Sequence, residues 1–138
     1  MNLGRVRLAT LALLAAASLA LAVTDWKAPP EEAARENPVP ASPEALARGK
    51  AVYADLCLPC HGTDGSGDAD MEAALQADVG DLSPSGDLEK RTDGELHWWI
   101  ENGSDLMPAF EGAVDDESLW ELIHYVRVLG EGEPPAER

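Results

Sequence analysis

Both cysteines of this chain lie in one short motif, Cys57-Leu58-Pro59-Cys60-His61, whose side chains could do specific chemistry. Two thiols three positions apart, followed directly by an imidazole, form the attachment pattern of a c-type haem. Thiols at this spacing can reach the two vinyl groups of one porphyrin, and the adjacent imidazole then lies beneath the iron. The motif therefore predicts one covalent haem c, with Cys57 and Cys60 as its thioethers and His61 as the proximal ligand.

Three other uses of the same motif fit the sequence less well. A structural zinc site needs four ligands, and outside the motif only His97 and His124 remain, at no finger-like spacing. A thioredoxin-like redox pair would need a βαβ context, of which the sequence shows no sign. A simple disulfide is compatible with an oxidising compartment, but it would leave unexplained a core that is sparse for a domain of this size.

A haem iron held by His61 could take a second axial ligand from one of four side chains: Met71, His97, Met107 and His124. Met71 follows His61 by only ten residues, which leaves little chain to reach the other haem face, and we expect it to pack within a small helix. His97 lies in a helical stretch with polar neighbours on its own side, where we expect partial exposure. His124 lies within a C-terminal helix, beside its apolar stripe rather than on it.

Met107 is the best placed of the four candidates. It lies in an irregular segment, residues 102–110, between two predicted helices and 46 residues after His61. Pro108 stiffens the backbone behind the sulfur and prevents this segment from becoming helical. A loop methionine commonly only fills a gap, but with a haem upstream we expect Met107 to be the distal ligand.

The elements that must position these residues are helical. A helix beginning at Pro43, with Ser42 as its N-cap, carries the chain directly into Cys57. A second helix begins at the capping box of Thr92 and Glu95 and ends at Gly103. Of its two neighbouring tryptophans, Trp98 and Trp99, we expect one to pack inward and the other to cover surface. The first helix presents four residues on one face: Leu46, Gly49, Tyr53 and Leu56.

The last predicted helix covers residues 116–129 and ends at Gly130. It is amphipathic, with an apolar stripe of Leu119, Leu122, Ile123 and Val126.

Glycine in the middle of the first helix costs helix stability, so Gly49 predicts the close approach of another helix, and residues 122–125 are the obvious partner. No segment alternates between apolar and polar residues as a strand would, so the predicted class is all-α.

The N-terminal 22 residues resemble a signal peptide. Arg5 and Arg7 precede an apolar run over residues 8–23, and Ala20-Leu21-Ala22 offers a cleavage site after Ala22. The alternative is an uncleaved anchor over residues 8–23, with the arginines inside and Trp26 near the outer interface. Both predictions place the folded part outside the cytoplasm, in the periplasm or otherwise exported.

The remaining boundaries follow from composition. Residues 23–42 are rich in proline and predict an extended linker, which would space an anchored domain from the membrane, or form a strap or loose arm on a cleaved chain. Residues 43–130 form the expected domain, and residues 131–138 a disordered tail.

Acidic residues dominate the chain. Its 26 Asp and Glu against 10 Lys and Arg give a formal net charge of −16. Nucleic acid is excluded as a partner because phosphate binding needs a basic surface, whereas a redox protein with a basic docking surface is complementary. The acidic loop over residues 64–81 lacks the spacing of an EF-hand and is expected to be solvated rather than to bind calcium.

Further residues accompany the motif at 57–61: Gly-Thr-Asp-Gly at 62–65, Asp-Gly-Glu-Leu at 93–96, Asn-Gly at 102–103, Met-Pro-Ala-Phe at 107–110, and a closing helix that includes residues 119–127. With these, the chain resembles single-haem class I cytochromes c over residues 43–130. The resemblance implies three main helices packed around one covalent haem, with His61 proximal and Met107 distal. It also implies that Gly49 and Tyr53 pack on Leu122 and Tyr125. Many such proteins dock through a ring of lysines, which this chain lacks.

An iron ligated on both sides has no open position for a small-molecule substrate, and such a site suits one-electron transfer. We therefore expect a periplasmic electron carrier that is not itself an enzyme. One alternative is a haem subunit, or a membrane-tethered module, of a larger oxidoreductase complex. Another is a haem ligand sensor or weak peroxidase, which would require Met107 to detach.

Overall fold

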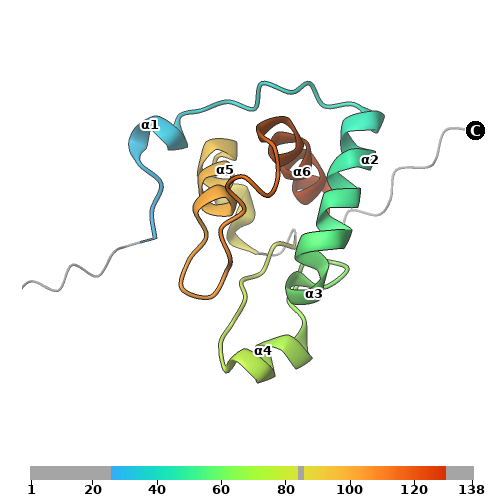
Figure 1. Cartoon of the computed structure of the whole chain (residues 1–138), viewed down its shortest axis with the longest axis vertical. Helices are drawn as coiled ribbons and strands as arrows, with labels where there is room; N and C mark the ends of the chain where they lie inside the picture. Colours follow the sequence, from blue (N-terminus) through green and yellow to red (C-terminus); the bar gives the residue numbers. More distant parts are fainter. Residues whose placement is uncertain (1–25, 84–85, 130–138) are drawn as a thin grey trace, which may run out of the picture.

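The computed structural model describes residues 26–83 and 86–129 (Figure 1). The elements in chain order are α1 (Pro30–Ala33), α2 (Pro43–Val52), the π-helical turn η1 (Tyr53–Cys57), α3 (Leu58–His61), α4 (Ala69–Leu75), the 3-10 turn η2 (Asp87–Lys90), α5 (Asp93–Asn102) and α6 (Asp116–Val128). Across these two ranges the structure has no strand, only an isolated bridge between Glu111 and Val114. The predicted all-α class, with α2, α5 and α6 as its main helices, is confirmed.

Several predictions fall outside the described residues: the leader over residues 1–22, the tail over residues 131–138, and Gly130 as the end of the last helix. Of the helices that the structure describes, none has the length and apolar composition needed to cross a membrane.

Helix α2 begins as predicted. The Ser42 hydroxyl accepts a hydrogen bond from the Ala45 amide at 3.1 Å, and Pro43 occupies the first turn. The helix then continues through η1 into α3 without leaving helical backbone angles. The cysteine motif is therefore carried on the end of one long helical segment, whose direction is set by what α2 packs against.

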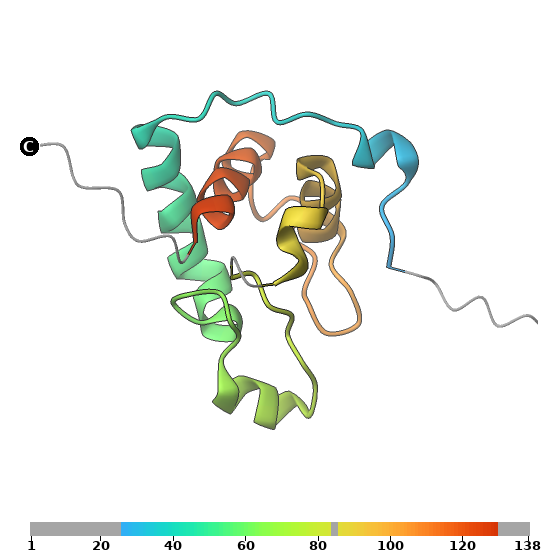
Figure 2. The same cartoon turned by 180° about the vertical axis from the view of Figure 1, so that it is seen from behind.

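That packing partner is α6, and the two helices lie against each other in Figures 1 and 2. A Cβ atom on Gly49 would collide with the Glu121 backbone and lie 3.0 Å from the Cβ of Tyr125. One helical turn on, the rings of Tyr53 and Tyr125 meet edge to face at 5.4 Å. The close approach that Gly49 predicted is confirmed: Tyr125 lies in the expected segment, and Glu121, which comes closest, directly precedes that segment.

Two small clusters form the core, and α6 contributes to both. Its apolar stripe is buried as predicted. One cluster contains Tyr53, Leu119, Leu122, Val126 and Leu129, and the other contains Leu96, Trp120 and Ile123.

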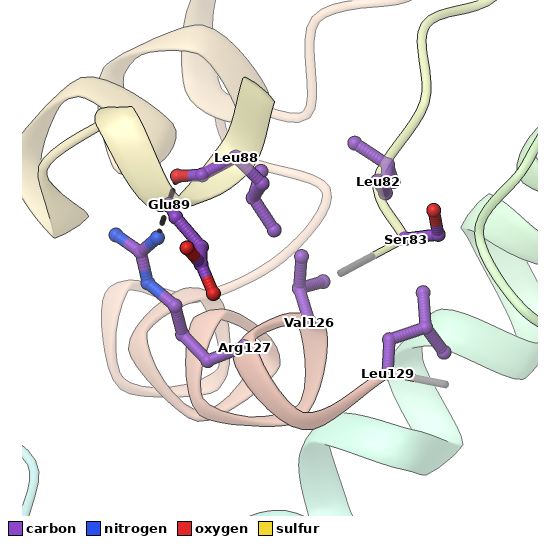
Figure 3. Close-up of a pocket in the computed structure, with 7 residues that line it drawn as sticks. All are labelled: Leu82, Ser83, Leu88, Glu89, Val126, Arg127 and Leu129. Atoms are coloured by element: carbon purple, nitrogen blue, oxygen red, sulfur yellow. Dashed lines mark hydrogen bonds between the residues drawn. The ribbon is translucent and has the colours of Figure 1, made fainter. Parts of the chain in front are cut away.

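Arg127 ties α6 to the start of α5. Its guanidinium donates to an Asp93 carboxylate oxygen at 2.7 and 2.9 Å, to the Leu88 carbonyl at 2.8 Å and to the Arg91 carbonyl at 2.7 Å. Figure 3 shows Arg127 reaching the Leu88 carbonyl beside a cavity of about 30 Å³, which contains no candidate haem ligand. The lining residues are Leu82, Ser83, Leu88, Glu89, Val126, Arg127 and Leu129.

Residues 26–42, which we call the strap, pack against α5 and α6 rather than extending as a free spacer (Figure 1). Ala28 is buried, and Val39 packs against the second core cluster. The Asn37 side chain donates to the Trp120 carbonyl at 2.9 Å, and a ring nitrogen of His124 lies 2.7 Å from the Val39 carbonyl. Of the arrangements that the proline-rich composition allowed, the structure has the strap, because these groups find partners on both helices.

His97 is completely buried, so the prediction of partial exposure is wrong. Its ring stacks on Trp120 at 4.2 Å, and its Nε2 lies 2.8 Å from a carboxylate oxygen of Asp116. Its Nδ1 lies 3.4 Å from the guanidinium of Arg35. Arg35 belongs to the strap, so one of the two polar partners of the buried His97 ring comes from a segment that the sequence suggested was a spacer.

The close helix crossing makes a testable prediction about Gly49→Ala. The added methyl group has no room, so we expect the free energy of unfolding of the haem-loaded protein to fall by about 1–3 kcal/mol in denaturant titrations. At an open helical position the same change stabilises a protein by up to about 1 kcal/mol. Equal or greater stability in Gly49→Ala would therefore contradict the close crossing, and Ala47→Gly on the exposed face of α2 calibrates the helix-propensity part.

Candidate haem site

One cavity of about 310 Å³ brings the four predicted site residues together: Cys57, Cys60, His61 and Met107 all line it. The volume lies in the range of roughly 300–1,000 Å³ typical of cofactor sites. The rest of the lining is mostly apolar and consists of Trp26, Leu56, Leu75, Asp78, Val79, Gly80, Ser104, Leu106, Pro108 and Phe110. Met71, His97 and His124 do not line the cavity, which agrees with the preference for Met107 among the four candidates.

The walls of this cavity come from separate parts of the chain. His61 ends α3, and residues 78–80 belong to the segment after α4. Met107 lies in the loop between α5 and α6. In Figures 1 and 2 this loop and α3 stand apart from each other. The proximal and distal candidates therefore approach one cavity from different elements, as ligation of an iron from two sides requires.

The turn after the cysteine motif is held by hydrogen bonds to its exposed carbonyls. The Tyr53 hydroxyl donates to the Gly62 carbonyl at 2.7 Å, and Tyr53 itself is buried. Amides of the following loop donate to the carbonyls of Cys60 and His61, at 2.9 and 3.0 Å. Burial raises the pKa of Tyr53, so its hydroxyl stays protonated and keeps its role as a donor. The end of α3 is thereby fixed without using the thiols or the imidazole.

His61 has the properties that an iron ligand needs. Its ring is buried, and no hydrogen-bond partner for Nδ1 exists among the described residues. Burial lowers the pKa of His61, with the Gly80 backbone acting in the opposite direction. The imidazole is therefore neutral at physiological pH, which is the form that binds a metal. An unsatisfied buried nitrogen costs about 1–3 kcal/mol, so the His61 ring is buried here at some cost in stability.

The two cysteines do not resemble a reactive redox pair. Both are half-buried and are not joined by a disulfide. Burial, with a smaller contribution from the neighbouring Cys60, raises the pKa of the Cys57 thiol to about 11. Catalytic thiols work through a lowered pKa, so a thioredoxin-like function does not fit. Within the described ranges, no three His, Cys, Asp or Glu side chains gather closely enough to hold a metal ion.

The loop that carries Met107 is anchored to α5 at both ends. At its start the Gly103 amide donates to a carbonyl of α5 at 2.8 Å, and at its end the Phe110 amide does the same at 3.1 Å. Inside the loop, the Ser104 amide donates to the Met107 carbonyl at 2.8 Å, and the Met107 amide donates to the Ser104 hydroxyl at 3.1 Å. Both backbone polar groups of Met107 are therefore bound, which fixes where its side chain starts.

Gly103 does more than end α5. Its φ of +66° belongs to the left-handed region that favours glycine. A Cβ atom there would lie 2.5 Å from the Met107 carbonyl oxygen and 2.6 Å from the Ala109 amide nitrogen. The sequence predicted Gly103 as a helix end, which is confirmed, but it did not predict that the loop folds back over this residue.

Two residues at the site were missed by the sequence analysis. Ser104 had a detectable signal, because serine three residues before another residue's amide often forms a local side-chain turn. Trp26 had a weaker one, as the only large aromatic residue in a proline-rich stretch. In the structure its indole lines the haem cavity and packs on Trp99. Both Trp98 and Trp99 are half-buried.

The acidic loop uses carboxylates for its own turns. Asp64 accepts hydrogen bonds from the Ser66 amide and hydroxyl at 3.0 and 2.7 Å. Asp68 caps α4 by accepting from the Met71 amide at 2.9 Å. Met71 itself is half-buried on this short helix. These local hydrogen bonds give two acidic residues of the loop a structural role.

Comparisons with known proteins identify the family. A family model described as cytochrome c oxidase, cbb3-type, subunit III matches residues 44–126. The cbb3-type cytochrome c oxidase subunit FixP of Rhizobium meliloti is 33% identical over 94 residues, covering 68% of this chain and 31% of the relative. The FixPc subunit of Rhizobium leguminosarum bv. viciae is 33% identical over 93 residues, covering 67% and 31%.

The FixP subunit of Rhizobium etli is 35% identical over 86 residues, covering 62% of this chain and 28% of the relative. The chain thus spans about a third of the length of these relatives. The matched region contains the cysteine motif, all three main helices up to Val126, and the loop of Met107. The chain is a c-type cytochrome with a covalent haem, and it belongs to the family of cbb3-type cytochrome c oxidase subunit III.

Proposed function

We propose that this chain transfers single electrons in the periplasm on one haem c, attached through Cys57 and Cys60 and ligated by His61 and Met107. The observation that carries the proposal is that these four side chains line one cavity with mostly apolar walls. When bound, the haem supplies a one-electron iron couple.

The protein's own residues hold that couple in place. Helix α3 presents the neutral imidazole of His61. The hydrogen bonds between Ser104 and Met107 fix the loop between α5 and α6, which presents the Met107 thioether. Ligation from two sides leaves no position for a substrate, so the site favours electron transfer over substrate chemistry and over ligand sensing. Apolar walls exclude water and favour the less charged ferrous state.

Among electron-transfer functions, we favour a haem module that serves a larger oxidase complex. The similar proteins are named as oxidase subunits, and they are about three times as long as the matched region. A free periplasmic carrier is the second candidate, supported by the alanine pair at residues 20 and 22, which suits cleavage.

The start of the strap bears on the tethered form. Trp26 lines the cavity, and it follows the end of the apolar run at Val23 by three residues. Three residues span at most about 10 Å. If residues 8–23 remain as an anchor, the haem site is therefore held beside the membrane, where a membrane-bound partner could reach it.

The proposal predicts one haem per chain. The protein should be produced in a host able to attach c-type haems and examined by pyridine-haemochrome spectroscopy and intact mass. We expect one covalent haem, and the same mass also gives the mature N-terminus. Cys57→Ala should leave at most one thioether, which the haemochrome spectrum detects. Colourless wild-type protein from such a host would overturn the proposal.

Met107→Ala tests the distal ligand. We expect a reduction potential lower by on the order of 0.1 V, within the roughly 0.8 V that haem axial ligands span. We also expect carbon monoxide to bind rapidly to the ferrous variant but not to the wild type. Met71→Ala is the matched control, because Met71 is half-buried outside the cavity. If Met107→Ala keeps the wild-type potential and spectrum, the ligand assignment is wrong.

The acidic charge predicts salt-sensitive docking. With a basic redox protein as partner, we expect the second-order rate constant of electron transfer to fall at least about tenfold between roughly 10 mM and 0.5 M salt. A neutral small-molecule oxidant serves as the control and should show little change. A flat salt response with the protein partner would contradict basic docking, but it would leave the electron-transfer function intact.

Recovery from membranes separates the two candidates. A module of an oxidase should co-purify with haem-containing membrane proteins after mild detergent extraction, whereas a free carrier should appear in the periplasmic fraction.

A further inference from the structure

Trp26 lies outside the region that matches the family, yet it borders the haem cavity. Its indole stacks on that of Trp99, with ring centroids 4.8 Å apart and planes inclined by 16°. Its Nε1 donates a hydrogen bond to the Gly103 carbonyl at 2.6 Å. In the other direction, the Trp99 indole donates to the Trp26 carbonyl at 3.2 Å. Three contacts therefore join the beginning of the strap to the end of α5.

The hydrogen bond from Trp26 reaches the distal loop where the loop begins. Gly103 is the residue at which α5 gives way to the loop of Met107, and its amide is already bound to the Trp99 carbonyl. The loop then folds back so closely that the Met107 carbonyl would lie within 2.5 Å of any Cβ on Gly103. Holding the Gly103 carbonyl therefore restrains the peptide against which Met107 packs.

Trp26 is itself held in place. Ala28, two residues further on, is buried, and the far end of the strap is bound to α6 through Asn37. On the other side of the stack, the Arg91 guanidinium lies 4.9 Å from the ring centroid of Trp99. Although 42% of Trp26 is exposed, its indole is thus held between the rest of the strap and α5.

We propose that Trp26 is a positioning residue for the distal ligand, a clamp by which the strap keeps the loop of Met107 closed over the iron. The inference rests on the proposed function, since it assumes that Met107 ligates the haem. It gives residues 26–28 a role at the cofactor that the family match does not include. Loss of one hydrogen bond of this kind shifts an equilibrium by roughly three- to tenfold, and loss of the stacking contact shifts it by a similar factor.

Two substitutions separate these contacts. Trp26→Phe removes the Nε1 donor and keeps an aromatic ring on Trp99, whereas Trp26→Ala removes both. Trp98→Phe is the matched control, because Trp98 is a half-buried tryptophan on α5 that does not line the cavity. Each haem-loaded variant is compared with the wild type in its carbon monoxide binding rate, its reduction potential and the visible absorption band specific to thioether-ligated ferric haem.

We expect carbon monoxide to bind about three- to tenfold faster to ferrous Trp26→Phe and at least about tenfold faster to Trp26→Ala. The reduction potential should fall in the same order, and the thioether band should weaken. Trp98→Phe should match the wild type in all three readouts, even if its melting temperature falls.

Wild-type rates and an intact thioether band in Trp26→Ala would overturn the clamp. So would equal effects of Trp26→Phe and Trp98→Phe, since these would indicate general destabilisation. Failure of the proposed function is distinct, because there the wild type itself would lack the thioether band and bind carbon monoxide rapidly.

Discussion

The close contact of α2 with α6 at Gly49 is the constraint on which the rest of the structure depends. Helix α2 runs through η1 into α3, so the angle at which it meets α6 also aims the cysteine motif. Tyr53 joins these two roles, because its ring packs on Tyr125 and its hydroxyl holds the Gly62 carbonyl at the end of the motif. A side chain at Gly49 would collide with the Glu121 backbone and force the two helices apart. Packing and cofactor geometry are therefore set at one contact.

The haem completes a core that the chain alone leaves small. The two buried clusters share α6 but leave an apolar-walled cavity between α3 and the loop of Met107. Small domains seldom bury enough apolar surface to be stable unaided, and a covalent cofactor adds such surface without the possibility of dissociation. The imidazole of His61, buried and neutral, suits contact with such a cofactor. The haem site is thus also part of what stabilises the fold.

Ion pairs with carboxylates hold the arginines of the described residues. Every arginine of the described ranges is paired with a carboxylate: Arg35, Arg48, Arg91 and Arg127. Glu121 is buried, and both of its carboxylate oxygens accept hydrogen bonds from the Nε of Arg48, at 2.8 and 2.9 Å. These pairs link separate parts of the fold. The chain keeps a large excess of acidic side chains beyond them, which would suit the basic partner proposed above.

Some of this architecture follows from the sequence by itself. The covalent chemistry of Cys57 and Cys60 and the caps that start α2 and α5 depend on spacings of a few residues, so local pattern determines them. The roles of Trp26 and His97 do not, because their partners lie 77 and 62 residues away along the chain, at Gly103 and Arg35. Proline-rich composition is compatible with a free spacer or a strap, and only the surface offered by folded α5 and α6 decides between them. Contacts between residues so far apart exist only after the helices have packed, which is why tertiary structure alone assigned them.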